Sequence, residues 1–328
     1  MHQPPSWRYG YEASGAAACY QLCLRHSRCR LDDPGLAEHC GGCNPACNAD
    51  NPGITPADPD LDEILQNVGG LAFDIRGFAC PARQIPRLVP LVWDNRQTMP
   101  DDLTSGLAVS PERVFRVREV RRRVHCTLDL SVRGTLRLPD NVPLWLAPGA
   151  PDEVLEWMWE NPVETRSALA SNRFAGIGAP HFSVYGDQCP LTWRVNMKRM
   201  LVMYSELREV ASTVAATVTV PNRFFAEQWA GWVADNPDVN VLAVNTQMWR
   251  TDRQFHRMFA LFVEFTRLVG RSLHYLVFGP AVEDRISLVR ASLPQCSIIS
   301  SYLYNASENR PSETGIRPGN GRWRMADG

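Results

Sequence analysis

The sequence lacks a long apolar run, an appreciable net charge and, with a single exception, lysine. No apolar stretch approaches the roughly 18 residues that a membrane-spanning helix needs, so we expect no membrane partner. A formal net charge of −1 provides no overall field that would draw the chain to nucleic acid or to a membrane surface. Lys198 is the only lysine, which we attribute to arginine-biased codon usage rather than to function.

Several catalytic and cofactor motifs are also missing. The chain has no G-x4-G-K-[ST], no G-x-G-x2-G after a strand, no H-E-x2-H and no G-x-S-x-G. ATP hydrolysis, dinucleotide oxidoreduction and serine-hydrolase chemistry therefore have no motif support. The first residues carry neither the basic nor the apolar region of a signal peptide, so we expect a cytoplasmic protein whose thiols stay reduced.

Cysteine, in contrast, is abundant and clustered. Six of the ten cysteines fall within 29 residues, with the spacing C-x3-C-x5-C-x10-C-x2-C-x3-C: Cys19, Cys23, Cys29, Cys40, Cys43 and Cys47. Thiolates gathered in a segment rich in glycine, asparagine and proline indicate a metal centre that folds the segment. Zinc and a [4Fe–4S] cluster both take four such ligands, and the spacing does not decide between them. Disulfides are the third alternative.

The chain divides into residues 1–60, a cysteine-rich metal-binding module, and residues 61–328, an α/β domain. Strands are predicted at 87–93, 105–109, 142–146, 182–185, 214–220, 239–244, 273–278 and 297–303, and helices from 110 and over 152–159, 222–234, 253–268 and 281–290, with a long one from 190. Strands that alternate with helices favour right-handed crossovers and a parallel sheet. We expect a (β/α)-barrel that need not be complete or regular, with a doubly wound open sheet as the alternative.

Polar side chains concentrate at one predicted strand end, in the segment from His181 to Pro190. The carboxyl ends of parallel strands carry the active site in α/β folds, so we predict His181, Tyr185 and Asp187 as acid/base or metal-holding residues. Asp187 could instead cap the helix that begins at Pro190. Ser183 would contact a substrate at the same strand end.

Further substrate contacts are predicted on the following helix and at later strand ends. Arg194 and Lys198 are four residues apart, so both could hold one anion, whereas Arg199 is predicted to be a solvated side chain. Asn222, Asn245 and Gly279 follow three successive strands. Together these residues would form a pocket for a small anionic, nucleotide-like ligand.

A basic run supplies a different hypothesis. Its arginines are Arg113, Arg116, Arg118, Arg121, Arg122 and Arg123. Such a run can contact the phosphates of nucleic acid, or it can simply form a solvated face. Phe115 is the only aromatic residue within it, which weakens a single-strand-binding interpretation.

The strand end around His181 also resembles a known family. Pro180-His181-Phe182-Ser183-Val184-Tyr185-Gly186-Asp187 is similar to the P-[HD]-F-S-x-Y-x-D-x-P pattern of the uncharacterised domain of unknown function 4417, and Asn196 and Arg199 on the next helix add to the likeness. The resemblance covers about residues 144–305. It implies a phage, plasmid or mobile-element context and no established activity. His181 stands where the family usually has an acidic residue, and Pro190 follows at a wider spacing.

Two hypotheses therefore remain for function. The first is an enzyme that acts on an anionic, nucleotide-like substrate at the strand ends, with a zinc or [4Fe–4S] centre as staple or redox cofactor. The second is a non-catalytic, zinc-containing nucleic-acid-binding or adaptor protein that uses the arginine run. The reaction and the oligomeric state do not follow from the sequence.

Overall fold

The computed structural model describes residues 61–80, 85–92, 105–120, 123–184 and 190–301. Within them, eight parallel strands close into a barrel, and each strand pairs with the next of the eight along the chain. The strands are β1 (Leu88–Val92), β2 (Leu107–Val109), β5 (Leu144–Leu146), β6 (Gly176–Gly178), β7 (Thr213–Thr217), β8 (Val241–Asn245), β9 (His274–Phe278) and β10 (Cys296–Ser300). The barrel is closed where β10 pairs with β1, with Leu88 opposite Ile298. This confirms the predicted (β/α)-barrel over the open sheet.

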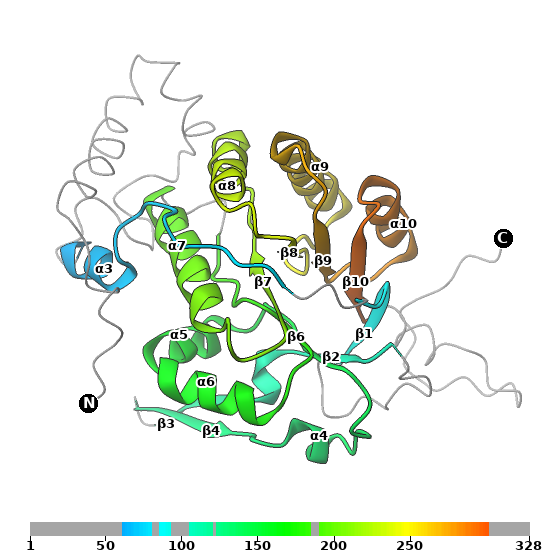
Figure 1. Cartoon of the computed structure of the whole chain (residues 1–328). Coiled ribbons are helices and arrows are strands. Elements are labelled where there is room, and N and C mark those ends of the chain that lie inside the picture. Colours follow the sequence, from blue (N-terminus) through cyan, green and yellow to red (C-terminus); the bar gives the residue numbers. More distant parts are fainter. Residues whose placement is uncertain (1–60, 81–84, 93–104, 121–122, 185–189, 302–328) are drawn as a thin grey trace, which may run out of the picture.

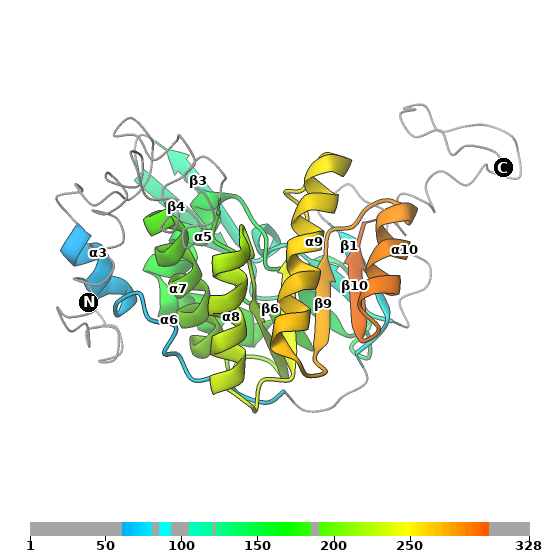
Figure 2. The same ribbon diagram turned by 90° about the horizontal axis from the view of Figure 1, so that it is seen from above.

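Helices surround the barrel (Figures 1 and 2). They are α5 (Asp152–Glu160), α6 (Pro162–Ser171), α7 (Pro190–Glu206), α8 (Arg223–Asp235), α9 (Asp252–Val269) and α10 (Glu283–Ser292). The sequence of α9 explains its boundaries and its buried face. Thr251 and Gln254 form a capping box at its start, Gly270 ends it in the left-handed conformation, and Phe255, Phe259 and Phe262 recur at helical spacing on the buried side.

The barrel interior is filled by a few large side chains set against small ones. Trp145 and Phe278 occupy it together with Ala108, Ala215 and Ala243. A Cβ atom on Gly176 would lie 2.2 Å from the ring of Trp145, so β6 needs glycine at this position. Because two of the three residues of β6 are glycines, which are rare in strands, the strand was predicted too late, at 182–185.

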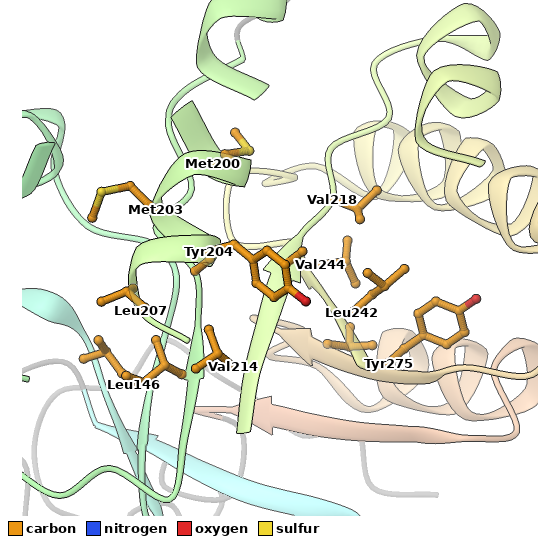
Figure 3. Packing of buried hydrophobic residues seen from close by; sticks show 14 of the residues in the cluster. Leu146, Met200, Met203, Tyr204, Leu207, Val214, Val218, Leu242, Val244 and Tyr275 are labelled. Carbon is orange, nitrogen blue, oxygen red and sulfur yellow. The ribbon is translucent and has the colours of Figure 1, made fainter. Parts of the chain in front are cut away.

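A second apolar layer lies between the barrel and α7. Figure 3 shows Tyr204 of α7 and Leu207, the residue after this helix, beside Val214 of β7, within the larger buried cluster. Four consecutive residues of this helix, from Leu201 to Tyr204, are buried. A helix that is buried all round must be covered on both sides, and the second cover is the segment that precedes the barrel.

That segment, residues 71–80, is called the strap here. It follows α3 (Leu61–Val68) and runs past the carboxyl ends of α7 and α8 to the amino end of the barrel (Figure 2). The indole of Trp232 donates to the carbonyl of Ile75, and the amide N–H of Gly77 donates to Asn236. At the end of the strap, the backbone of Cys80 makes two hydrogen bonds with the side chain of Asn240, and its thiol donates to the carbonyl of Val214. The strap therefore covers the amino end of the barrel.

An antiparallel hairpin interrupts the β/α alternation after β2. The helix predicted from Ser110 is wrong: a 3-10 turn, Pro111–Arg113, leads into β3 (Phe115–Val120) and β4 (Arg123–Leu128), followed by a short helix, α4 (Val132–Thr135). The alternation in Phe-Arg-Val-Arg explains the strand, because Phe115 is buried, Val117 half-buried, and Arg116 and Arg118 exposed. The hairpin lies beside α5, across the molecule from α10 (Figure 1).

The remaining helix and strand predictions agree with the structure to within a few residues. Two further helices were missed, α3 (Leu61–Val68) and α6, which begins at Pro162, directly after the helix predicted at 152–159. Proline fits the first turn of a helix as well as it ends one. No helix in the described residues is long and apolar enough to cross a membrane. The cysteine-rich module, residues 1–60, lies outside the described residues.

Candidate active site

The carboxyl ends of β6, β7 and β8 bring three polar side chains together. His181 follows β6, Thr219 lies just beyond β7, and Asn245 is the last residue of β8. The ring Nε2 of His181 lies 2.7 Å from Thr219 Oγ1, and its Nδ1 lies 3.3 Å from Asn245 Nδ2. The backbone N–H of His181 donates to the carbonyl of Pro148, which lies just after β5. This hydrogen bond joins the segment after β6 to the segment after β5.

The hydrogen bonds among these residues run in one direction. The backbone N–H of Gln247 donates to Asn245 Oδ1 at 3.2 Å, so the amide nitrogen of Asn245 faces His181. Asn245 therefore donates to His181 Nδ1, and the imidazole proton is on Nε2, where it donates to Thr219 Oγ1. The hydroxyl proton of Thr219 is then directed away from His181, and the chain of bonds ends in an O–H donor.

Burial keeps the histidine neutral. It lowers the pKa of His181 to about 4, and the nearby Asp152 carboxylate offsets only part of this shift. Asp152 begins α5 and accepts a hydrogen bond of 2.6 Å from Ser183. A neutral imidazole with both nitrogens engaged is a poor general acid or base near pH 7. The geometry fits an orienting role for His181 better than an acid/base role, and the acid/base role stays a prediction.

Two glycines bring the backbone close to this cluster. A Cβ atom on Gly149 would lie 2.4 Å from Gln247 Oε1 and 2.7 Å from Asn245 Nδ2. Gly279 has φ +104°, and a Cβ atom there would lie 2.4 Å from Gln247 Cγ. The side-chain nitrogen of Gln247 is buried without a hydrogen-bond partner in the described part of the chain. An unpaired buried donor costs about 1–3 kcal/mol, so the site offers a second N–H or O–H group to an acceptor oxygen.

The structure places the predicted substrate-binding residues differently. Asn245 and Gly279 are in the cluster, and Ser183 lies at its edge with Asp152. Asn222 caps α8 by accepting a hydrogen bond from the N–H of Phe225. Tyr185 and Asp187 lie outside the described residues.

The anion clamp predicted for Arg194 and Lys198 is wrong. Lys198 is only 1% exposed, and its ammonium group donates to the carbonyl of Ala72 and to the carboxylate of Asp74, both in the strap. The guanidinium group of Arg194 lies over the ring of Phe224, 6.0 Å from its centroid. The two side chains are four residues apart, but the ammonium group of Lys198 is already bound to the strap.

Arg199 was predicted to be solvated and is instead enclosed. Its two terminal nitrogens bind the two oxygens of Glu156 at 2.8 and 2.5 Å. Its guanidinium lies over the rings of Phe182 and Trp159, at 3.9 and 4.9 Å from their centroids. This arrangement ties α7 to α5 and fixes Phe182, which follows His181 in the chain.

The other predicted sites are only partly described. Arg116 and Arg118 are exposed on β3. Arg113 is buried, so it is not part of an exposed basic surface. Arg121 and Arg122, the side chain of Arg123 and all six cysteines of the module lie outside the described residues. Within the described ranges, no group of three or more His, Cys, Asp or Glu side chains is arranged to hold a metal ion.

Thr219 and Gln247 are the two site residues that were not predicted. Thr219 was assigned to the interior of a β-branched strand, although Thr217 and Thr219 share one face and the strand ends between them. The alternation of threonines was the available signal. Searches of protein-family models, of curated proteins and of solved structures found no match to this chain.

Proposed function

We propose that this protein is an enzyme whose active site lies at the carboxyl ends of β6, β7 and β8. The observation that carries the proposal is the directed chain of hydrogen bonds from Gln247 through Asn245 and His181 to Thr219. Such a chain orders four groups in order to present one hydroxyl donor, which is more organisation than a solvated loop requires.

The reaction class that fits is one in which a substrate oxygen gains negative charge. Donors that are already oriented stabilise such charge without reorganising during the reaction. Thr219 would be the catalytic residue that donates to this oxygen, with His181 and Asn245 as positioning residues. A carbonyl or phosphoryl group is the substrate chemistry that this arrangement suits. An anionic, nucleotide-like substrate remains part of the proposal, without Lys198 as a ligand.

The test is a ligand screen followed by turnover. The full chain would be screened by thermal shift against sugar phosphates, nucleotides and oxoacids, and each stabilising compound would be followed by ¹H and ³¹P NMR for conversion. Thr219→Val removes the donor and keeps the side-chain shape, so we expect it to reduce turnover about 100-fold while the fold persists. Thr217→Val, on the same strand face, is the matched control. Equal turnover in the Thr219→Val variant and the unmodified protein would refute the proposal.

The cysteine-rich module extends this proposal. Its six cysteines would hold zinc or a [4Fe–4S] cluster, which would serve as a structural staple or as a redox cofactor. Anaerobic purification with metal analysis and a visible spectrum separates the two, because only the iron–sulfur cluster absorbs near 400 nm. A metal-free, folded protein would remove the metal centre from the proposal. The resemblance to the domain of unknown function 4417 adds a mobile-element context and no reaction.

A second candidate function is favoured by the hairpin. Arg116 and Arg118 project from the same exposed face of β3, opposite Thr127 and His125 of β4. Arg116 is also 3.8 Å from Asp129, which reduces its availability to phosphates. A nucleic-acid-binding protein would lose affinity steeply as salt is raised and would lose it again in an Arg116→Ala, Arg118→Ala double variant. Binding that is independent of salt or of these arginines would exclude this candidate.

A further inference from the structure

A cavity of about 1150 Å³ opens at the amino end of the barrel, opposite the candidate active site. Its walls come from the strap, from the turn between α6 and β6, and from the turn between α7 and β7. Each wall supplies one arginine: Arg76 from the strap, Arg173 after α6 and Arg208 after α7. Three segments far apart in the sequence therefore bring one arginine each to the same cavity.

The cavity lining carries a small excess of positive charge, because its three arginines outnumber its two acidic residues. Among the described residues, none of the three forms an ion pair, although Glu209 and Asp238 line the same cavity. The carboxyl ends of α6 and α7 favour a nearby cation, which accounts in part for Arg173 and Arg208. The position of Arg76 has no such explanation, because it lies in the strap and not at a helix end.

Arg173 is kept in a backbone conformation that suits glycine better. Its φ is 51°, in the left-handed region, at the position after a helix where glycine is common. A side chain in this conformation costs about 1 kcal/mol relative to glycine. The arginine at this position gives up backbone stability and gains a guanidinium group at the cavity.

The rest of the lining matches an organic anion rather than a bare ion. Phe78 and Phe174 provide an apolar floor, and Phe78 is fixed by stacking on Tyr204 with 4.3 Å between ring centroids. Arg208 lies over the Phe78 ring at 5.7 Å from the centroid. An adjoining cavity of about 580 Å³ shares Arg208 and Glu209 with the first and adds Arg166 and Glu206.

We propose that this cavity binds a small molecule that carries two or more phosphate groups. Arginine binds phosphate oxygens in pairs, so arginines on three walls of one cavity suit a ligand with several phosphates. The combined space is sufficient for a nucleotide-sized ligand, and the phenylalanines would contact its organic part. This site is separate from the one at the carboxyl end of the barrel and does not depend on the proposed function.

Calorimetric titration of the full chain with inorganic pyrophosphate and with ADP tests the proposal. We expect both probes to bind, and we expect Arg173→Gly and Arg208→Gln each to weaken binding roughly tenfold or more. Arg137→Gly is the matched control, because Arg137 is exposed, has φ 53° and does not line the cavity. Arg173→Gly and Arg137→Gly relieve the same left-handed backbone strain. If Arg173→Gly weakens binding and Arg137→Gly does not, the loss comes from the missing side chain at the cavity and not from the change in the backbone.

The possible outcomes separate this site from the candidate active site. Tighter binding of ADP than of pyrophosphate identifies a nucleotide, and equal binding identifies the phosphates as the recognised group; both support the proposal. Absence of binding, or binding that Arg173→Gly and Arg208→Gln leave unchanged, overturns it. Binding that is lost in Thr219→Val assigns the anion to the other end of the barrel, which also overturns it while supporting the proposed function.

Discussion

The two ends of this barrel are built in different ways. At the carboxyl end, neutral side chains are joined by hydrogen bonds around His181, and partly exposed groups converge on Thr219. At the amino end, the strap is fixed by buried contacts, including the ion pair of Lys198 and the hydrogen bonds of Cys80. The difference indicates that one end is organised to hold the fold together and the other to present polar groups. Substitutions at matched positions can test this division.

The sharpest comparison uses two glycines, one at each end. A Cβ atom on Gly77 in the strap would lie 2.2 Å from Val239 Cγ2 and 2.9 Å from Asn236 Cβ, which are packed and cannot move easily. We expect Gly77→Ala to lower the free energy of unfolding by about 3 kcal/mol. At Gly149 the close atoms are the ends of two side chains, so Gly149→Ala should cost less than about 1 kcal/mol and displace Asn245. Urea denaturation measures both, and equal losses would remove the distinction between the two ends.

Acidification should act on the carboxyl end through His181. The pKa of this residue is about 4 in the folded protein and 6.5 in the unfolded chain, so the unfolded chain binds more protons between these values. The neutral, buried imidazole makes its full contribution to the free energy of unfolding above pH 6.5. This free energy falls by about 2–3 kcal/mol as the pH is lowered to 4. We expect His181→Gln to remove this part of the pH dependence when unfolding is measured from pH 7 to pH 4. An unchanged slope in the variant would show that His181 is not buried as described.

The strap should depend on the ion pair between the buried Lys198 and the exposed Asp74. Asp74→Ala leaves the ammonium group of Lys198 buried with only the carbonyl of Ala72, and we expect a loss of about 2 kcal/mol, less than for a pair buried on both sides because Asp74 is exposed. Asp62→Ala removes an exposed carboxylate from α3 and serves as the control, with an expected change below about 0.5 kcal/mol. Urea midpoints that match in the two variants would contradict this role of Lys198.

The most direct effect on the hydrogen bonds of the site is expected from Asn245→Asp. A carboxylate accepts rather than donates, so it would draw the imidazole proton of His181 to Nδ1 and raise the pKa of the ring. Long-range ¹H–¹⁵N spectra of the histidines report this tautomer directly. We expect the Nε2–H form in the unmodified protein and Nδ1–H in the variant. A spectrum that shows Nδ1–H in both would contradict the assigned direction of the hydrogen bonds.

The sequence predicted the barrel because most of its strands are short β-branched runs followed by helices with clear periodicity. It failed where packing overrides propensity, as at β6, where Gly176 leaves room for the ring of Trp145. The site was predicted in part, since His181, Asn245 and Gly279 follow strands and strand ends converge. Thr219 was missed because a threonine inside a β-branched run looks like a strand residue. The buried state of Lys198 depends on Asp74, more than a hundred residues away in the chain, and no local pattern reveals such a contact.

The strap has a consequence for how this protein is made. Its residues leave the ribosome early, yet Ile75, Gly77 and Cys80 bind residues that lie 157 to 160 positions later. The strap therefore cannot form these hydrogen bonds until most of the chain has been synthesised. Premature termination before Asn240 would yield a nascent chain with an open barrel and a free strap, which is a substrate that chaperones and proteases recognise.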